Sequence, residues 1–393
     1  MKPRIVAFTK DWGDVPTCTT HILRRLAREL PVLWVESIGT RKPQLTSAGD
    51  WARLRGKLRR ALGRARRPES NLRVLTPPLI PQARSVASRA LNRRLFRWLA
   101  GRELRQMGGG PLEYWCFVPN AVDLLPVGGR APAPGGGGAA ASLVVYYCVD
   151  DWSAFHNLDG AWLAAKEAEL LPRADVVFTP ARPLEEKCRR AAGGRVHYAP
   201  HGVDYEAFAR ALAAETEIPA DARALPKPIV GFYGNLHPWV DFGLIGRLAQ
   251  RRPGWTFLLI GTVFGDAAQA ARRPNVHFLG RREHRDLPAY CKAFDAAMIP
   301  YDTRQARMQS VNPVKTKELL AAGVPVAAAD LPELRGYGAD VMLCRTEEDW
   351  LAALERQIAR RDRAEISRRM AGEDWSAKVA ALRRAVEEAR ARR

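Results

Sequence analysis

Short runs of β-branched, aromatic and other apolar residues alternate with segments of helical periodicity along nearly the whole chain. This alternation is typical of parallel β-sheets whose strands are joined by helical crossovers. The strands predicted in the first half are residues 4–8, 32–36, 72–76, 114–118, 143–149, 176–179 and 196–199. Those predicted in the second half are residues 229–233, 256–260, 276–279, 296–300, 325–328 and 341–344. The pattern predicts an α/β fold with two Rossmann-like, doubly wound parallel sheets.

The stretch between the two series of strands divides the chain. Residues 206–228 are polar, rich in Ala and Pro, and without a strand pattern, so we interpret them as a hinge. The predicted domains are residues 1–205 and 206–373, and a helical tail of residues 374–393 is expected to return to the first domain. A Gly- and Ala-rich segment, residues 128–141, lacks the large apolar side chains of a core and predicts a flexible loop.

Composition limits the class of protein. The 393 residues are 47% hydrophobic, enough for a sizeable core and unlike a disordered chain. The six cysteines stand far apart with no C-x-x-C pair, which favours buried free thiols in a reducing compartment over a zinc site or disulfides. No apolar run has the length of a secretory or membrane-spanning segment, so we expect a cytoplasmic protein, soluble or bound peripherally to the inner face of the cell membrane.

Positive charge is concentrated in one part of the first domain. The chain has a net charge of +20, and the basic insertion of residues 41–105 holds 18 Lys and Arg against three Asp and Glu. Apolar residues recur there at helical spacing, at Trp51, Leu54, Leu58 and Leu62, with basic residues on the other faces, at Arg53, Lys57, Arg60 and Arg64. A basic amphipathic helix with an aromatic anchor is typical of proteins that bind an anionic membrane surface. No nucleic-acid-binding motif accompanies the charge, so nucleic acid is not an expected partner.

A second apolar stripe follows in the same insertion. Leu91, Leu95 and Trp98 are spaced as on one helix face and are surrounded by Arg93, Arg94, Arg97 and Arg102. The sequence leaves two interpretations open, namely packing of the stripe on the domain core with the arginines in solvent, or contact with a membrane.

One segment in the second half carries the strongest chemical signal. Asn312 is a suitable N-cap, and Pro313 suits the first helical position, where its missing N–H costs nothing. Gly323 is expected to end the helix in the left-handed conformation. The amides and positive dipole end of the helix form a site for a diphosphate. Lys315 and Glu318 share a helix face, which places a cation for phosphate beside a carboxylate for sugar hydroxyls.

The run from Asn312 to Val326, N-P-x-K-x-x-E-L-L-A-A-G-x-P-V, resembles the donor-nucleotide helix of GT-B-fold glycosyltransferases of the retaining group 1/family 4 class. Further stretches are similar to that family in the same order: His201-Gly202-Val203-Asp204 with Phe208, Gly231 to Leu236 followed by Trp239 and Asp241, and Asn275 to Gly280. In the first half, Trp12, Glu36 and Tyr147 to Trp152 resemble a bacterial cell-surface polysaccharide subgroup that includes teichuronic acid transferases. The resemblance implies two domains that face each other across a cleft.

The resemblance also implies roles for individual residues. Glu318 would bind the ribose of the nucleotide, and Lys315 the diphosphate. The other positions expected on the nucleotide-sugar side are Gly234, Asn235, Gly280, Arg281, Ser310 and Asn312. Trp12 and Asp150 are expected on the acceptor side, and the candidate catalytic residues are Asp150, Asp151 and His201. Asp150 and Asp151 could equally cap the following helix, and His201 could be a turn histidine.

Two departures from the family pattern affect the donor site. Ser310 stands where many members have a second glutamate, and the usual Arg and Lys pair is missing between Asn235 and Asp241. Phosphate charge would then be met by Lys315 together with Arg281, Arg304 or Arg307. The chain contains no D-x-D motif, which favours a transferase that needs neither a metal nor another cofactor.

The expected function is therefore metal-independent hexosyl transfer with retention, in the synthesis of a cell-surface polysaccharide. The expected partners are a nucleotide-sugar donor of UDP or GDP type, a saccharide or lipid-linked saccharide acceptor, and an anionic membrane surface. Two alternatives stay open, namely a GT-B-fold epimerase or phosphorylase, and a non-catalytic basic protein that binds lipid or RNA on the same fold.

Overall fold

The computed structural model describes residues 1–14, 16–37, 65–126, 142–154 and 159–393. These form two compact units, Met1–Pro200 with Val379–Arg393 (unit 1) and His201–Lys378 (unit 2). The predicted amphipathic helix that carries Trp51, Arg53, Lys57, Arg60 and Arg64, and the predicted loop 128–141, lie outside the described residues. All six cysteines are free and buried, which confirms the prediction from their spacing.

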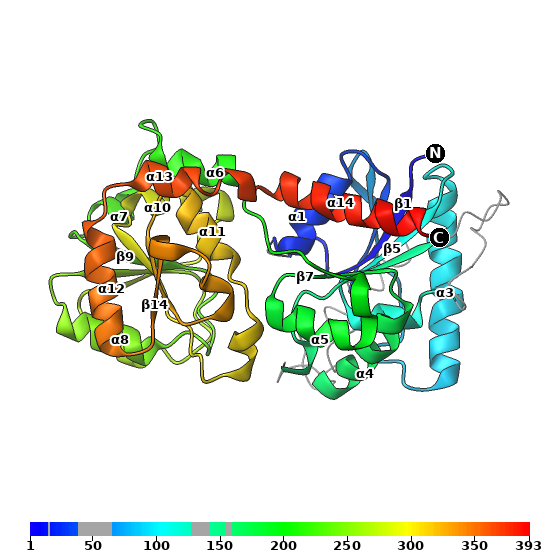
Figure 1. The fold of residues 1–393 in the computed structure, drawn as a ribbon, viewed down its shortest axis with the longest axis horizontal. Helices are drawn as coiled ribbons and strands as arrows, with labels where there is room; N and C mark the ends of the chain where they lie inside the picture. Colours follow the sequence, from blue (N-terminus) through cyan, green and yellow to red (C-terminus); the bar gives the residue numbers. More distant parts are fainter. Residues whose placement is uncertain (15, 38–64, 127–141, 155–158) are drawn as a thin grey trace. The chain divides into compact units, whose positions relative to one another are not determined.

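Unit 1 is built on an eight-stranded sheet in the order β3-β4-β2-β1-β5-β6-β7-β8 (Figure 1). Its strands are β1 (Arg4–Phe8), β2 (Val32–Val35), β3 (Arg66–Glu69), β4 (Leu72–Leu75), β5 (Leu112–Cys116), β6 (Leu143–Tyr147), β7 (Val176–Thr179) and β8 (Val196–Tyr198). All neighbouring pairs are parallel except β3 and β4. The edge strand β3, with the sequence RRPE, was not predicted because it contains no apolar residue. The other seven were predicted from apolar runs, since all of them except the edge strand β8 are buried on both faces.

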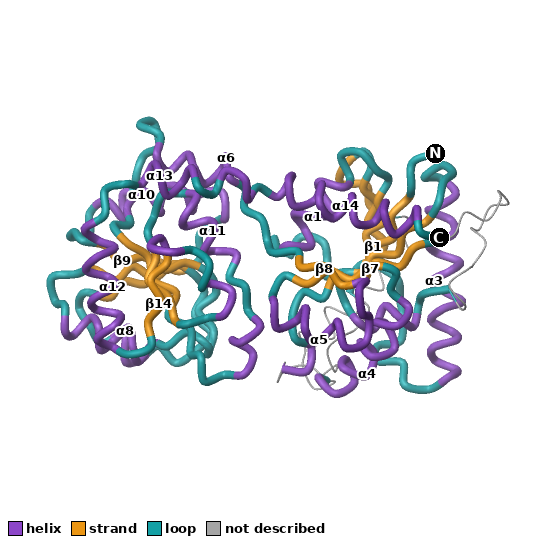
Figure 2. The backbone as a smooth tube through the Cα atoms, viewed as in Figure 1, coloured by secondary structure: helices purple, strands orange, loops and turns teal. Residues whose placement is uncertain are grey.

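Helices of unit 1 connect and cover these strands (Figure 2). They are α1 (Cys18–Leu26), α3 (Val86–Arg105), α4 (Gly160–Leu170), α5 (Arg182–Ala192) and the part of α14 (Trp375–Ala391) from Val379 onward, with short 3-10 helices η1 (Pro119–Asp123), η2 (Trp152–Ala154), η3 (Leu171–Arg173) and η4 (Gly193–Arg195). The fully buried Glu113 on β5 anchors α14 by ion pairs with Arg383, at 2.6 Å, and Arg390. A charge buried without such partners would be costly, so this pairing fixes the tail to unit 1.

Unit 2 has a six-stranded parallel sheet in the order β11-β10-β9-β12-β13-β14. Its strands are β9 (Ile229–Tyr233), β10 (Thr256–Ile260), β11 (Val276–Gly280), β12 (Ala296–Ile299), β13 (Val326–Ala329) and β14 (Val341–Cys344). Its α-helices are α6 (Tyr205–Ala209), α7 (Ala220–Arg223), α8 (Phe242–Arg251), α9 (Ala268–Ala271), α10 (Leu287–Ala293), α11 (Val314–Ala321), α12 (Glu347–Ala359) and α13 (Arg363–Arg368). Its 3-10 helices are η5 (Arg210–Leu212), η6 (His284–Asp286), η7 (Ala306–Ser310), η8 (Pro332–Leu334), η9 (Gly338–Asp340) and η10 (Ala371–Glu373).

The two sheets confirm the predicted α/β class with two doubly wound units. The sequence set the domain boundaries at residues 205 and 373, and the described chain divides at Pro200 and Lys378. Residues 206–228, expected as a hinge, instead form short helices that pack into unit 2 through the buried side chains of Phe208, Ala211 and Ala222. Helix formation by this Ala-rich stretch follows from its high intrinsic helix propensity.

Candidate functional site

The order of strands in unit 2 places a candidate site at one point of the sheet. The chain runs from the central strand β9 outward through β10 and β11, and then returns to the other side of β9 through β12. In open parallel sheets, ligands bind outside the carboxyl ends of the strands where the order reverses. The loops that follow β9 and β12, and helix α11, supply most of the residues predicted for nucleotide binding, and the end of β11 with the residue after it supplies Gly280 and Arg281.

Helix α11 differs from the prediction at its start. Asn312 was predicted as the N-cap and Pro313 as the first helical residue, but Pro313 is the N-cap, with φ −71° and ψ 109°. The Asn312 side chain donates instead to Glu333 at 3.4 Å. With ψ at 109°, Pro313 is itself outside the helical region, so the helix begins one residue later than predicted, at Val314. The prediction that Asn312 is the N-cap of this helix was therefore wrong.

The end of α11 is as predicted. Gly323 has φ +71°, its N–H donates to the Leu320 carbonyl at 2.8 Å, and Val324 N–H donates to Leu319 at 2.9 Å. These two bonds form a Schellman motif. A Cβ on Gly323 would also lie 2.6 Å from the Arg363 carbonyl oxygen, so both conformation and space require glycine.

Lys315 lies in the first turn of α11 against the turn that follows β9. Gly234 in that turn has φ +122°, and a Cβ there would lie 2.6 Å from the Lys315 Nζ. The ammonium sits 4.3 Å from the centre of the Phe232 ring and 5.4 Å from that of Tyr301. Within the described parts of the chain no carboxylate pairs with Lys315, so aromatic faces hold the ammonium and leave its charge for an anion.

Glu318 follows Lys315 by three residues, and its carboxylate is buried, with 9% of the side chain exposed. The Tyr233 hydroxyl donates to Oε2 at 2.9 Å, and Nε2 of His284 lies 2.8 Å from Oε1. This hydrogen bond raises the pKa of His284, while burial and the Glu318 charge raise the pKa of Tyr233 well above its usual range. Each carboxylate oxygen can accept a second hydrogen bond, so Glu318 retains capacity for two hydroxyls of a ligand.

His284 was not identified from the sequence. Its ring packs edge-on against Phe208 at 5.4 Å, so it links the α6 segment to Glu318. A histidine in a polar run between β11 and α10 carries no signal by itself, because only the tertiary fold brings it to a carboxylate 34 residues away. Tyr233 lay in a stretch that resembled the family, but its hydroxyl had no assigned partner.

The arginines considered for phosphate fall into two groups. Arg304 is bound by Asp302 at 2.7 Å, and Arg281 lies 3.5 Å from Glu283. Arg307 has its guanidinium 4.6 Å from the centre of the Trp239 ring. The same ring stacks on His237 at 4.1 Å, and burial together with the charges of Arg307 and Lys315 lowers the pKa of His237. Arg307 and Lys315 therefore both contribute positive potential after β9.

The remaining predicted nucleotide-side residues lie at the carboxyl ends of neighbouring strands or in the loop before α11. Asn235 is exposed beside Gly234, and Gly280 ends β11 with φ +68°. Ser310 is buried at the end of η7, and its hydroxyl donates to the Arg307 carbonyl at 3.1 Å. Ser310 thus has a hydrogen-bond role within the loop that carries Arg307.

The acceptor-side candidates lie in unit 1. Trp12 follows β1, is half-buried, and packs its ring edge-on against Trp34 at 5.1 Å. The backbone N–H of Trp12 donates to the buried Glu36 carboxylate at 3.1 Å. Asp150 and Asp151 follow β6, and both are half-buried. One Asp150 oxygen accepts from the Asp151 N–H at 2.9 Å.

Asp151 is part of a hydrogen-bonded network that joins the loop after β6 to helix α5. Its Oδ1 accepts from the Ser153 hydroxyl at 2.7 Å and from the Lys187 ammonium at 2.9 Å. Burial alone would raise the pKa of Asp151, but these partners lower it below its ordinary value. Asp151 therefore caps the η2 turn and takes part in an ion pair.

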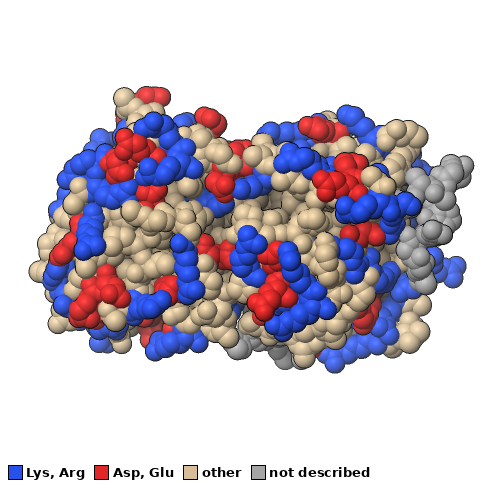
Figure 3. All heavy atoms as spheres, in the orientation of Figure 1, with Lys and Arg blue, Asp and Glu red and all other residues tan. Residues whose placement is uncertain are grey.

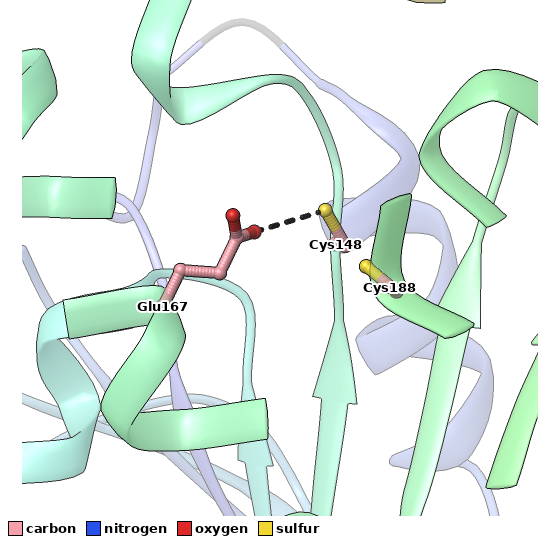
Figure 4. A group of neighbouring side chains, drawn as sticks. All are labelled: Cys148, Glu167 and Cys188. Carbon is pink, nitrogen blue, oxygen red and sulfur yellow. Dashed lines mark hydrogen bonds between the residues drawn. The ribbon is translucent and has the colours of Figure 1, made fainter. Parts of the chain in front are cut away.

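Lys187 also reaches Glu167 at 2.7 Å, and Glu167 accepts from the Cys148 thiol at 3.3 Å (Figure 4). The side chains of Cys148, Glu167 and Cys188 are buried, and the two Sγ atoms and one carboxylate oxygen lie within 4.8 Å of one another. Atoms at this spacing could bind a metal ion together. The hydrogen bond with Cys188 and burial raise the pKa of Cys148 well above its usual range. Because metal ligation by cysteine needs the thiolate, the raised pKa of Cys148 and the ion pair between Lys187 and Glu167 favour a hydrogen-bonded cluster over a metal site.

His201 begins unit 2 and is buried. Its ring lies 6.0 Å from Trp375, and its carbonyl oxygen accepts from the buried Lys317 ammonium at 2.6 Å. Burial lowers the pKa of Lys317, which also pairs with Glu373. These contacts tie the start of unit 2 to α11 and η10, and so help to position α11.

The chain shares its fold with proteins of known structure. Over its whole length it is similar to sucrose-phosphate synthase from Thermosynechococcus elongatus (TM-score 0.64, 16% identity, 100% of both chains) and to HepE from Anabaena in complex with UDP (TM-score 0.63, 14% identity, 99% of this chain and 100% of that one). At this level of identity the likeness shows the fold, which is that of GT-B glycosyltransferases. The predicted GT-B fold is confirmed.

Residues 227–360 match the model of the family described as "Glycosyl transferases group 1", which confirms the resemblance drawn from the segment around Lys315 and Glu318. The chain is also 31% identical over 205 residues to TuaH of Bacillus subtilis (strain 168), named as a teichuronic acid biosynthesis glycosyltransferase. That match covers 48% of this chain and 51% of TuaH, so the chain spans about half the length of the curated relative. Among the described residues no helix is both long enough and apolar enough to cross a bilayer.

Proposed function

We propose that the protein transfers a hexosyl group, with retention, from a UDP-sugar to a saccharide or lipid-linked saccharide acceptor. One observation carries the proposal: at the switch point of unit 2, an ammonium with no carboxylate partner among the described residues lies one helical turn from a buried carboxylate held by Tyr233 and His284. A cation and a hydrogen-bond acceptor at this spacing suit the diphosphate and the sugar hydroxyls of a nucleotide-sugar. The choice of UDP is supported by its presence in the structure of HepE.

The residues of unit 2 would act mainly by stabilising the leaving group. In the reaction the bond between the sugar C1 and the diphosphate oxygen breaks, and a bond forms between C1 and an acceptor hydroxyl oxygen. The acceptor proton passes to the departing phosphate oxygen, so no separate base is needed. Lys315, the amides of the first turn of α11 and the nearby Arg307 would stabilise the negative charge that develops on the diphosphate.

The cellular setting is part of the proposal. TuaH is named for teichuronic acid biosynthesis, which supports a role for this chain in the synthesis of a cell-surface polysaccharide. We propose that it works in the cytoplasm at the anionic inner surface of the membrane, supported by the excess of 18 Lys and Arg over three Asp and Glu in residues 41–105.

Calorimetric titration of UDP, GDP and ADP into the whole protein tests donor binding. We expect UDP to bind, and Lys315→Ala to weaken it about 30- to 100-fold, because a hydrogen bond to a charged group is worth about 2 to 3 kcal/mol. Lys227→Ala is the matched control, since Lys227 lies near the amino edge of the same sheet, where it pairs with Asp295.

Product analysis then separates transferase from the alternatives. Wild-type protein incubated with UDP-glucose or UDP-galactose and a bacterial glycolipid extract should release UDP and extend a glycan. Isomerisation of the UDP-sugar without added glycan would indicate an epimerase. If wild-type protein bound no nucleotide, or if Lys315→Ala bound it as tightly as wild type does, the proposed donor site would be wrong. A non-catalytic protein would then be favoured.

A further inference from the structure

Helix α3 of unit 1 carries an unusual set of side chains. Its 20 residues include six arginines, at positions 89, 93, 94, 97, 102 and 105, and a single acid, Glu103. Glu103 is buried and pairs with Arg73 at 2.9 Å, so it does not offset charge on the outer face. The helix lies along one side of unit 1 and is cyan in Figure 1.

The inner face of α3 is fixed to the unit by specific contacts. Phe96 packs against Phe8 of β1, with ring centres 5.2 Å apart. The Asn92 side chain accepts from the Ile80 N–H and donates to the Ile80 carbonyl, both at 2.9 Å. Arg93 donates to the Asp123 carbonyl at 3.1 Å. The orientation of the helix is therefore determined, and the residues on its other face are held away from the core.

The outer face of α3 combines large apolar and basic side chains. Trp98 is 64% exposed, Leu91 is 56% exposed and Val86 is 76% exposed. Leu91 and Trp98 are two helical turns apart, and the exposed Arg94 lies between them on the same face. In the described parts of the chain, no carboxylate pairs with Arg94, Arg97 or Arg105. The sequence left core packing and membrane contact open for the stripe of Leu91, Leu95 and Trp98; Leu91 and Trp98 are exposed and Leu95 is half-buried. Phe96 and Leu99 pack on the core instead.

The outer face differs from the rest of the basic surface. In the view of Figure 3, Lys and Arg are spread over both units and are interspersed with Asp and Glu. Basic charge alone would attract any polyanion, including nucleic acid. Exposed aliphatic side chains add nothing to a phosphate contact, whereas they gain free energy on entering the interfacial region of a bilayer.

We propose that the outer face of α3, formed by Val86, Leu91, Arg94, Arg97, Trp98 and Arg105, docks on an anionic lipid bilayer. Trp98 and Leu91 insert at the level of the headgroups, and the arginines contact lipid phosphates. The surface deepens the proposed function, because a lipid-linked acceptor lies in the same bilayer. Docking needs neither donor nor acceptor, so it is measured apart from glycosyl transfer.

Flotation of the whole protein with vesicles tests the proposal. Vesicles of phosphatidylcholine mixed equally with phosphatidylglycerol should carry the wild type, and vesicles of phosphatidylcholine alone should carry much less. Arg94→Gln/Arg97→Gln should weaken binding about 30-fold, since each basic residue near an anionic surface contributes about a factor of five. Leu91→Ala/Trp98→Ala should weaken it about 10- to 100-fold, and its residual binding should be more sensitive to salt.

Two matched controls show whether the effect belongs to α3. Arg190→Gln changes a side chain that is 77% exposed on α5 of the same unit, and Phe264→Ala removes an exposed aromatic ring from unit 2. Both should float as wild type does. Circular dichroism should show that every variant is folded, as expected for exposed positions.

Three results would overturn the proposal. Equal flotation of wild type and both α3 variants would assign any lipid binding to other residues. Loss of binding in the arginine variant alone, with Leu91→Ala/Trp98→Ala unchanged, would indicate attraction without insertion. Tight binding of a single-stranded RNA oligonucleotide that depends on Trp98, with no flotation, would identify nucleic acid as the partner. In all three cases both α3 variants should bind UDP as tightly as wild type does. A failure of membrane docking can therefore be distinguished from a failure of the donor site.

Discussion

Two buried glutamates, Glu318 in unit 2 and Glu167 in unit 1, have similar surroundings. Each carboxylate accepts a hydrogen bond from a tyrosine at or near the end of a central parallel strand, Tyr233 at 2.9 Å and Tyr146 at 2.6 Å. The second partner differs. Glu318 meets His284, and Glu167 meets the ammonium of Lys187.

The second partner decides what each carboxylate can do. Burial alone would lower the pKa of Lys187, but Glu167 and Asp151 together raise it above its usual range, so the lysine stays charged. Glu167 is therefore neutralised, and Lys187 joins α4 to the loop after β6. His284 is a weaker counter-ion, because its charge depends on pH, and the Glu318 oxygens keep acceptor capacity for a ligand. A buried carboxylate paired with lysine stabilises the fold, whereas one held by a phenol and an imidazole suits binding.

The largest expected effect is on ligand binding by Glu318. Glu318→Ala should weaken the affinity for UDP by about 10²- to 10³-fold, because two charge-assisted hydrogen bonds to the ribose, together worth about 3 to 4 kcal/mol, would be lost. Calorimetry measures the change. Glu348→Ala, at a glutamate that is 73% exposed on α12, is the control and should bind UDP normally. If Glu318→Ala bound UDP with unchanged affinity, Glu318 would not be a ligand-binding carboxylate, and its contrast with Glu167 would be wrong.

The next effect should appear in stability rather than binding. Lys187→Met leaves the Glu167 charge buried without its partner, and should lower the free energy of unfolding by about 2 to 4 kcal/mol. Denaturant unfolding, followed by circular dichroism, measures this loss, and UDP affinity should not change. The double variant Lys187→Met/Glu167→Gln should recover most of the stability, since it removes the uncompensated charge. Failure of this rescue would show that Lys187 acts mainly through Asp151.

The same contrast explains what the sequence could predict. Strands were recognisable wherever burial on both faces produced an apolar run, and the Schellman end of α11 was recognisable from Gly323, because both depend on local chemistry. Lys315 and Glu318 were identified because they are three residues apart on one helix. His284 was missed because its contact with Glu318 spans 34 residues, and the exposed polar strand β3 was missed because it lacks the pattern of a buried strand. The exposure of Trp98 could not be decided, because helical spacing gives the faces of α3 but not which face meets the core.

The smallest effect concerns the partner of Glu318 itself. The pKa of His284 is raised above its ordinary value of 6.5 in the folded protein, so its ion pair with Glu318 contributes fully below that value. The contribution is lost as the pH rises through the folded pKa of His284. Because 38% of the side chain is exposed and water screens the pair, we expect less than about 1 kcal/mol.

Comparison with His284→Gln isolates this contribution from other titrating groups. The difference in unfolding free energy between wild type and His284→Gln should be larger at pH 6 than at pH 9, with wild type the more stable at the lower pH. Glutamine can still donate a hydrogen bond to Glu318, so the variant removes the charge and keeps the contact. A difference that is constant between these pH values would show that His284 holds Glu318 as a neutral donor throughout. In that case Glu318 would have no titrating counter-ion among the described residues, and the contrast with Glu167 and Lys187 would become sharper.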